Sequence, residues 1–255
     1  MILKHDRILK WPFVLLLLLL ASCTYLPELE ENTSYENIRS ETGDYILLSD
    51  ATMDYDRIFL FIPGGLVDPH VYLCWMDELV QQTPGMAIVS VKFPTNLAIL
   101  NRGKIRRVMK EFEEVQYWVI GGHSLGGVVA AKEIEEQPEV FDGLIFLGSW
   151  TTSFADLGSW DGFALSIYGS NDGLSSPEEI LENDLYLPEG IAISSSPEIR
   201  GTGPLTFYYE IQGANHSGFG CYGLQEGDDE AEISPELQQE EMNQLMSYFL
   251  NFLWD

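Results

Sequence analysis

The stretch that most constrains the fold lies at residues 115–136, VQYWVIGGHSLGGVVAAKEIEE. It predicts a short buried strand at 117–121, a sharp turn at Ser124, and a helix directly after the turn. Gly122 and Gly126 lie two residues on either side of the serine. A serine in so tight a turn needs a positive φ and neighbours without side-chain bulk. The pattern therefore favours a nucleophilic hydroxyl at the start of a helix, and the alternative is a glycine-rich turn that only packs a helix on a strand.

The composition suits a single globular domain. The chain has 255 residues, 45% of them hydrophobic. Its formal charge is −27, from 40 acidic and 13 basic residues. So large an acidic excess disfavours nucleic acid as a partner and repels anionic substrates at long range. It otherwise indicates a solvated surface and identifies no ligand.

The first 22 residues have the composition of an export signal. Basic residues at Lys4, Arg7 and Lys10 precede an apolar run at 11–20 with six consecutive leucines. This run is shorter than the roughly twenty residues needed to cross a bilayer, so a retained transmembrane helix is the weaker alternative. The sequence Leu-Ala-Ser-Cys that ends at Cys23 resembles the lipobox of bacterial lipoproteins.

This resemblance implies that the chain is cut before Cys23 and that the cysteine receives acyl chains of the palmitate type. The mature protein would then be lipid-anchored to the bacterial cell envelope, on its periplasmic or surface side. Ordinary secretion of a soluble protein is the alternative. We accordingly divide the chain into a signal peptide at 1–22, an acidic tether at 23–43 and a globular domain at 44–255.

Apolar patterning predicts alternating strands and helices in the domain. The predicted strands lie at 44–49, which we place at the edge of the sheet, and at 55–62, 86–93, 117–121, 143–147, 163–168 and 205–211. The predicted helices start at Asp68-Pro69, cover 96–114, follow Ser124, and cover 235–253. This order predicts an α/β fold with a mostly parallel sheet covered on both faces. The short link between 147 and 163 leaves no room for a cap domain.

Five basic residues are concentrated in the predicted helix at 96–114. They are Arg102, Lys104, Arg106, Arg107 and Lys110. We expect a solvated helix face, and contact with anionic lipid headgroups is the alternative.

A serine nucleophile needs a base, and the four histidines differ in position. His5 leaves with the signal peptide. His123 adjoins Ser124, where its side chain should point away from the hydroxyl, and His70 should lie on the rim. His216 directly follows the last predicted strand, as expected of a base in the chain order serine, acid, histidine. A histidine with only a structural role in that loop is the alternative.

The acid should follow a strand that lies between the nucleophile and the base. Asp172 does so in YGSNDGL, where turn residues can hold its carboxylate toward the histidine. Asp142 precedes its strand and so lies at the wrong edge. The other aspartates considered lie in the connecting loop or after the next helix: Asp156, Asp161 and Asp184.

Two backbone amides are expected to stabilise a developing oxyanion. The amide of Leu125 lies at the start of the helix after Ser124. The second should come from Pro63-Gly64-Gly65-Leu66, where the sequence leaves the choice between Gly65 and Leu66 open.

Together the segments FIPGGLVDPHVY, GGHSLGG, YGSNDGL and GANHSGFGCYGLQEGD resemble the consecutive motifs of the α/β-hydrolase superfamily. The resemblance is specifically to a bacterial branch described as dienelactone-hydrolase-like, and it extends from about residue 44 to the C-terminus. It implies roles as nucleophile, acid and base for Ser124, Asp172 and His216. True dienelactone hydrolases use a cysteine nucleophile, whereas this chain has a serine there.

The predicted activity is hydrolysis of an ester-type bond in a small molecule through an acyl-enzyme. A membrane-anchored binding lipoprotein with an idle triad is the main alternative, and a thioesterase or peptidase is the alternative among enzymes. The sequence contains no zinc, phosphate-binding or dinucleotide motif, so we expect neither metal nor cofactor. The oligomeric state is left open.

Two further features of the sequence lie beside the predicted site. Cys74 and Cys221 should flank the same mouth, where they form either a disulfide or two buried thiols. The acidic segment 226–230 is expected to be a solvated loop, and a calcium site is the weaker alternative.

Overall fold

The structure is a computed structural model that describes residues 24–26 and 35–254. The predicted signal peptide and the acylation of Cys23 lie outside these described residues. Among the residues that are described, no helix combines the length and apolarity needed to cross a membrane.

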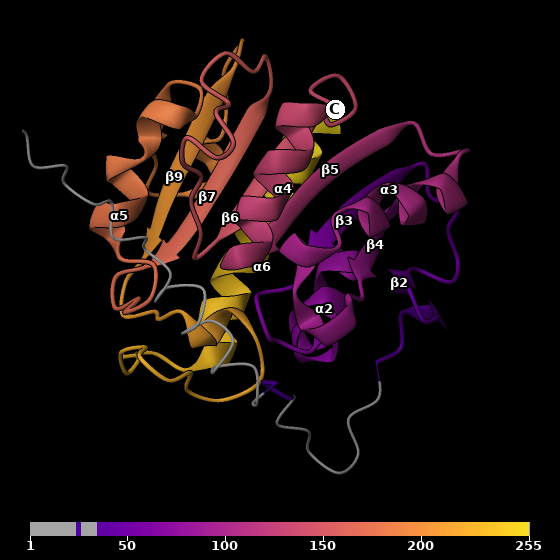
Figure 1. Ribbon diagram of the computed structural model, residues 1–255, viewed down its shortest axis with the longest axis horizontal. Coiled ribbons are helices and arrows are strands. Elements are labelled where there is room, and N and C mark those ends of the chain that lie inside the picture. The colour runs from indigo at the N-terminus through magenta and orange to yellow at the C-terminus, as the bar shows by residue number, and fades with distance from the viewer. Residues whose placement is uncertain (1–23, 27–34, 255) are drawn as a thin grey trace, which may run out of the picture.

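A mixed sheet forms the centre of the described part of the chain (Figure 1). Its strands are β1 (Ile38–Glu41), β2 (Tyr45–Ser49), β3 (Arg57–Ile62), β4 (Met86–Val91), β5 (Tyr117–His123), β6 (Gly143–Leu147), β7 (Phe163–Gly169), β8 (Gly190–Ala192) and β9 (Leu205–Ile211). The order across the sheet is β1-β2-β4-β3-β5-β6-β7-β9-β8. All neighbours from β4 to β8 are parallel, and β2 pairs antiparallel both with β4 and with the edge strand β1. The predicted α/β fold with a mostly parallel sheet is confirmed.

Helices cover both faces of this sheet. They are α2 (Leu73–Gln82), α3 (Gly103–Met109), α4 (Leu125–Glu136), α5 (Pro177–Glu182) and α6 (Pro235–Trp254). Because side chains alternate along a strand, β3 sends Phe59 and Phe61 to the core under α2 and α6, and Ile58 and Leu60 to the core under α3, α4 and α5. The chain enters α2 through the 3₁₀ turn η1 (Pro69–Tyr72), which Asp68 caps by accepting from the amide of His70 at 2.9 Å.

The sheet begins inside the segment predicted as a tether. Strand β1 pairs with β2, which places the predicted edge strand in the interior of the sheet. The preceding residue Asn37 is buried, and its amide donates to Asp77 Oδ1 of α2 at 2.8 Å. This strand could not be recognised in the sequence. It lies at the edge of the sheet, its residues are at most half-buried, and so apolar and polar residues do not alternate along it.

The single helix predicted at 96–114 is wrong. The chain there forms η2 (Pro94–Asn96), η3 (Ala98–Leu100), α3 and η4 (Lys110–Phe112). Thr95 and Asn96 have φ values of 56° and 50°, which a continuous α-helix cannot contain. Leu100, predicted on a buried stripe, is 75% exposed. Only the second half of the apolar pattern, at Ile105 and Val108, is a buried helix face.

Much of the basic cluster forms ion pairs within the domain. Arg106 contacts Glu133 of α4 at 3.1 Å, and Arg102 contacts the same carboxylate at 3.2 Å. Lys104 contacts Asp44 at 2.6 Å. These pairs use three of the five basic residues, and Arg107 and Lys110 are the exposed remainder of the cluster.

Strand β8 was not predicted, and α5 was expected only as a helix before Asp184, without bounds. Helix α5 has a capping box, in which Ser176 accepts from the amide of Glu179 and the Glu179 carboxylate accepts from Ser176. The spacing Ser-x-x-Glu was therefore a readable signal for α5. All three residues of β8 are exposed, so it has no apolar pattern.

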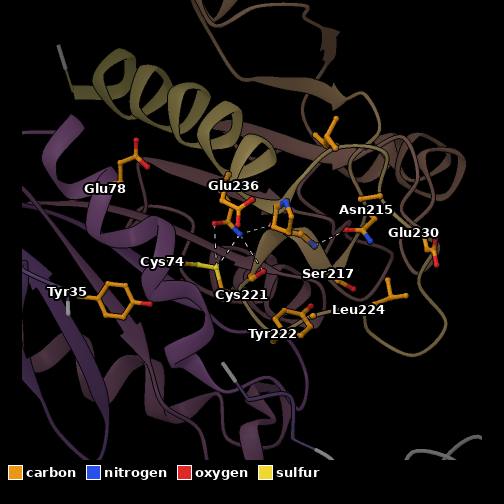
Figure 2. A pocket seen from close by; sticks show the side chains of 17 residues that line it. Tyr35, Cys74, Glu78, Asn215, Ser217, Cys221, Tyr222, Leu224, Glu230 and Glu236 are labelled. Carbon is orange, nitrogen blue, oxygen red and sulfur yellow. Dashed lines mark hydrogen bonds between the residues drawn. A yellow bond between two sulfur atoms is a disulfide. The ribbon is translucent and has the colours of Figure 1, made fainter. Parts of the chain in front are cut away.

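A disulfide joins Cys74 of α2 to Cys221, in the loop after β9, with 6.6 Å between the Cα atoms. Both cysteines line a cavity of about 1000 Å³, which Figure 2 shows together with Ser217 and Tyr222. Because the cavity exposes the disulfide, a small reductant can reach it.

We expect simultaneous replacement of Cys74 and Cys221 by serine to lower the free energy of unfolding by about 2–5 kcal/mol. The reason is that the disulfide joins residues 147 positions apart and so restricts the unfolded chain. Guanidinium chloride unfolding, followed by circular dichroism, measures the change. Reductant should lower the midpoint of the native protein and leave that of the double variant unchanged. Two alkylatable thiols in the untreated folded protein would contradict this pairing.

Candidate active site

The predicted turn at Ser124 lies between β5 and α4, at the carboxyl edge of the sheet. Ser124 has φ 53° and ψ −126°, a conformation that is strained for a residue with a side chain. A Cβ on Gly126 would lie 2.1 Å from the carbonyl oxygen of Ile62, and one on Gly122 would lie 2.5 Å from the same atom. Both predicted glycines are therefore required by the close approach of the turn to the end of β3.

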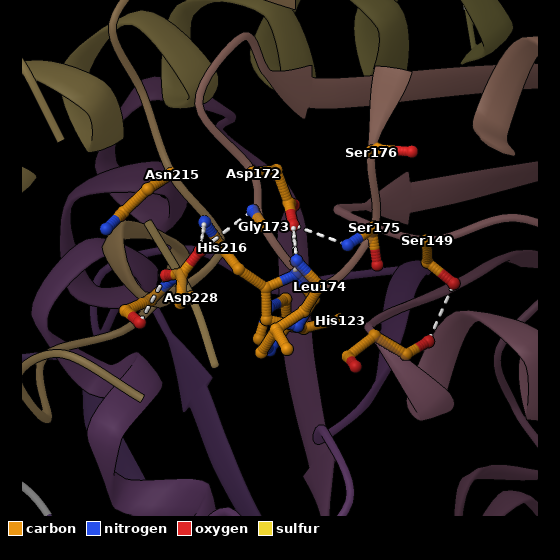
Figure 3. A network of polar contacts seen from close by, with 12 residues as sticks. His123, Ser149, Asp172, Gly173, Leu174, Ser175, Ser176, Asn215, His216 and Asp228 are labelled. Carbon is orange, nitrogen blue, oxygen red and sulfur yellow. Dashed lines mark hydrogen bonds and ion pairs between the residues drawn. The ribbon is translucent and has the colours of Figure 1, made fainter. Parts of the chain in front are cut away.

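Strand β6 holds the turn from the other side. The amide of Ser124 donates to the carbonyl of Leu147 at 3.0 Å. The hydroxyl of Ser149 donates to the carbonyl of Ser124 at 2.6 Å, as Figure 3 shows. These bonds fix the backbone of Ser124, and its own half-buried hydroxyl makes no capping bond to α4.

Asp172 and His216 form a buried pair. His216 Nδ1 lies 2.9 Å from Asp172 Oδ2 and 3.1 Å from Oδ1 (Figure 3). The carboxylate also accepts from the amides of Leu174 at 3.0 Å and Ser175 at 2.6 Å. A carboxylate can only accept, so Nδ1 is the donor of this bond, and in the neutral ring the free lone pair is then on Nε2.

His216 Nε2 is buried and has no hydrogen-bond partner among the described residues. The ring of His216 packs on the ring of His123, with 4.4 Å between centroids. The structure thus joins two of the three predicted catalytic residues and places the histidine beside the residue that precedes Ser124. The hydrogen bonds of the described residues include none from Ser124 Oγ to Nε2. Catalytic hydrogen bonds are often long without substrate.

His123 is a buried support below this pair. Burial, together with the neighbouring His216, lowers the pKa of His123 well below its ordinary value, so the ring is neutral. The amide of Gly64 donates to the hydroxyl of Tyr72 at 3.0 Å, and that hydroxyl lies 2.9 Å from His123 Nδ1. This chain of bonds connects the loop after β3 to the turn at Ser124.

Of the two amides proposed for the loop after β3, that of Leu66 is excluded. It donates to the carbonyl of Asn96 at 2.7 Å, so it is already used. The amide of Gly65 has no acceptor among the described residues, and a Cβ there would lie 3.1 Å from the Leu125 side chain. Leu125 is the first residue of α4, where an amide has no partner within the helix. Gly65 and Leu125 are therefore the candidate oxyanion donors.

Asp228 is a site residue that the sequence did not reveal. Its carboxylate accepts from the amides of His216 at 3.3 Å and Ser217 at 2.8 Å, and from the Ser217 hydroxyl at 2.6 Å. It also accepts from the amide of Gly173 at 3.1 Å (Figure 3). One carboxylate thus joins the loop that carries His216 to the loop that carries Asp172. No local pattern identifies this residue, because its partners are 11–55 positions away.

The acidic segment 226–230 is for the most part the solvated loop that was expected, because four of its five residues are exposed and only Asp228 is half-buried. Asp228 is directed at amide donors, and the described residues contain no group of three or more side chains able to hold a metal ion.

Gly148 and Gln238 also shape the site. Gly148 has φ 48°, and a Cβ there would lie 2.9 Å from Asp172 Oδ2 and 3.1 Å from His216 Nδ1. Gln238 of α6 is fully buried, accepts from the amide of Asn215 at 3.2 Å and donates to its carbonyl at 2.9 Å. The positive φ of Gly148 and the burial of Gln238 become apparent only in three dimensions.

The sequence matches the model of the alpha/beta hydrolase family over residues 58–240. The chain belongs to the alpha/beta hydrolase family. Solved structures agree with the fold of this α/β hydrolase. Est1E from Butyrivibrio proteoclasticus is 12% identical with a TM-score of 0.57, over 81% of this chain and 94% of that chain. The α/β hydrolase MGS-MChE2, from a metagenome of lagoon sediments at Mar Chica, Morocco, is 17% identical with a TM-score of 0.55, over 83% and 97%.

The dienelactone hydrolase of Anabaena variabilis is 15% identical with a TM-score of 0.52, over 81% of this chain and 90% of that chain. Among the curated proteins no match is found. At these identities the structural likeness shows the fold alone. The match to the family model is the observation that identifies the chain as a hydrolase.

We expect Gly126→Ala to lower the free energy of unfolding of this α/β hydrolase by about 1–3 kcal/mol or more. The added methyl would overlap the carbonyl oxygen of Ile62 at 2.1 Å, so backbone must shift. Thermal and urea unfolding measure the loss. Gly103→Ala is the matched control, because a Cβ there meets nothing within 4 Å. Equal effects of the two substitutions would contradict the close approach.

Proposed function

We propose that this α/β hydrolase cleaves an ester-type bond through an acyl-enzyme, with Ser124 as nucleophile, His216 as base and Asp172 as acid. One observation carries the proposal: a buried Asp172–His216 pair leaves Nε2 without a partner beside the strained turn at Ser124. An unpaired buried nitrogen is costly unless it serves a purpose, and accepting a proton from a nucleophile is such a purpose.

The chemistry follows from these positions. His216 Nε2 takes the proton of Ser124 Oγ as this oxygen attacks the ester carbonyl carbon. The amides of Leu125 and Gly65 then donate to the oxyanion. As the C–O bond breaks, Nε2 returns the proton to the leaving alcohol oxygen, and the acyl group stays on Ser124. Water, deprotonated by the same nitrogen, releases the carboxylic acid and restores the serine.

The strained turn favours an enzyme over a binding protein with an idle triad. A non-glycine residue in a sparsely populated backbone conformation costs about 1–3 kcal/mol. A binding module gains nothing from holding Ser124 at φ 53°. Among acyl substrates we favour esters, because one structural neighbour is the esterase domain of a Rhodothermus marinus protein. Another neighbour is an acylaminoacyl peptidase, so assays must separate esters from peptides and thioesters.

We further propose that Cys23 is acylated and anchors the enzyme to the bacterial cell envelope. The support is the sequence Leu-Ala-Ser-Cys after a basic and apolar segment. Several acyl chains on one residue are sufficient for stable anchoring.

A fluorophosphonate probe is expected to label the native protein and to leave Ser124→Ala unlabelled. With p-nitrophenyl esters, Asp172→Asn and His216→Asn should lower kcat on the order of 10⁴-fold, because the base is lost or held in the wrong tautomer. Parallel assays on acyl-thioesters and peptides rank the substrate classes.

The control is Ser153→Ala, which changes an exposed serine in the loop after β6 and should label like the native protein. A native protein that resists the probe, or a Ser124→Ala variant that reacts with it as fast, would contradict the proposed nucleophile.

Asp228 is expected to act as a positioning residue in this reaction. Asp228→Asn replaces one accepting oxygen by a donor, which opposes the amide of Ser217 at one position or the amides of Gly173 and His216 at the other. We expect kcat to fall about 10–100-fold with little change in KM, since hydrogen bonds to a charged group contribute about 1.5–3 kcal/mol. Fluorophosphonate labelling of Ser124 should slow in proportion, because it needs the same base.

Asp229→Asn is the matched control. It makes the same charge change one position later, on an exposed side chain, and should keep native kcat. Both variants are compared at a temperature well below their unfolding midpoints. A fall in KM and kcat together with unfolding, or equal losses in both variants, would contradict the positioning role.

A further inference from the structure

A short piece at the N-terminal end of the described chain is attached to the loop after β3. The amide of Tyr25 donates to the carbonyl of Leu66 at 2.9 Å, and the amide of Asp68 donates to the carbonyl of Tyr25 at 2.9 Å. Tyr25 thereby forms a parallel bridge with Val67. Residue 25 is thus bonded to the residues that directly follow Gly65, the candidate oxyanion donor.

The side chain of Tyr25 reaches the second loop of the site. Its ring packs on Tyr222 with 5.4 Å between centroids, and its hydroxyl accepts from the amide of Glu226 at 3.3 Å. Tyr222 follows Cys221 in the loop that carries His216. In Figure 1 the piece at 24–26 lies at the same end of the molecule as the loop after β9, and the C-terminal end of α6 lies at the opposite end.

These contacts limit where an anchor on Cys23 can be. Cys23 precedes Tyr25 by two residues. An extended chain spans at most about 3.3–3.6 Å per residue, so two residues reach at most about 7 Å from Tyr25. A lipid on Cys23 would therefore enter the bilayer beside the carboxyl edge of the sheet, where the site lies.

The surface at this edge suits contact with a bilayer. Three leucines are largely exposed there: Leu26 at 62%, Leu100 at 75% and Leu224 at 55%. Leu100 ends η3, whose neighbour Asn96 is bonded to Leu66, and Leu224 lies two residues after Tyr222. Exposed acidic residues at 226 and 229–230 would repel anionic headgroups, so a zwitterionic surface is the better partner.

We propose that the mouth of the site faces the bilayer that holds the anchor, and that the substrate is an acyl ester dissolved in that bilayer. This rests on the proposed function and on acylation of Cys23, and it adds the orientation of the enzyme and the physical state of its substrate. Tyr25 sets the orientation because it fixes the anchored segment to both loops of the site.

The test uses the lipidated full chain in phosphatidylcholine vesicles. One variant carries a flexible Gly/Ser linker of about twenty residues between Cys23 and Thr24, which lets the domain move about 25 Å from the anchor while Tyr25 keeps its contacts.

Two esters share one leaving group: water-soluble 4-methylumbelliferyl acetate, and 4-methylumbelliferyl palmitate incorporated in the vesicles. The linker should leave acetate hydrolysis within about twofold and lower palmitate hydrolysis about tenfold or more, since effective concentration falls steeply with linker length.

A second measurement reports orientation without activity. A fluorophore on Leu100→Cys, at the carboxyl edge, is compared with one on Leu185→Cys, which is 64% exposed in the turn before β8, at the amino edge. Nitroxide-labelled phosphatidylcholine should quench the label at 100 more than twice as strongly as the label at 185. Cys23→Ser, which cannot be anchored, should show little quenching at either position.

The outcomes separate the proposals. Equal quenching at both positions, or a linker variant that hydrolyses palmitate as fast as the native chain, overturns the orientation. Hydrolysis of acetate without palmitate overturns the membrane-dissolved substrate. If neither ester is hydrolysed and Ser124 resists fluorophosphonate, the proposed function fails, and the quenching ratio still decides the orientation.

Discussion

The geometry of the site depends on how closely the turn at Ser124 approaches the carbonyl oxygen of Ile62. Gly122 and Gly126 both lie against the oxygen of Ile62, at distances that leave no room for a Cβ. Because Ile62 ends β3, the turn at Ser124 is pressed against the start of the loop that contains Gly65. The bond from Ser124 to Leu147 fixes the same turn to the end of β6. Parallel strands end at a common edge, so the serine, the oxyanion loop and the loop of Gly148 meet there.

The other half of the site depends on polar groups rather than on apolar packing. The loop after β9 is held at Asn215 by Gln238, at Phe219 by the indole of Trp75, and at His216 by Asp228. Each of these bonds satisfies a backbone group that would otherwise be buried without a partner. A loop fixed at successive residues holds its imidazole in one orientation, which is what electrostatic preorganisation requires.

The elements with strong local patterns were predicted well, and the connections were not. β6 and β9 have the predicted bounds. β6 is a continuous apolar run between turn residues, and β9 is rich in the aromatic residues that strands favour. The pairing of Asp172 with His216 could be expected because each directly follows a strand of a parallel sheet. The helix predicted at 96–114 was wrong because apolar residues at the carboxyl edge, such as Leu100, imitated a buried stripe. Asp228 was missed since its role depends on loops brought together only by the fold.

His123 lies between the oxyanion loop and the loop that carries His216, and its ring is neutral. In the proposed mechanism His216 becomes cationic while its ring lies 4.4 Å from that of His123. A positive charge on His123 at this distance would oppose protonation of His216. The low pKa of His123 keeps its ring uncharged, so this repulsion is absent. The hydroxyl of Tyr72 contacts Nδ1 of this ring at 2.9 Å and also accepts from the amide of Gly64. One buried tyrosine therefore holds both the oxyanion loop and the neutral ring that packs on the base.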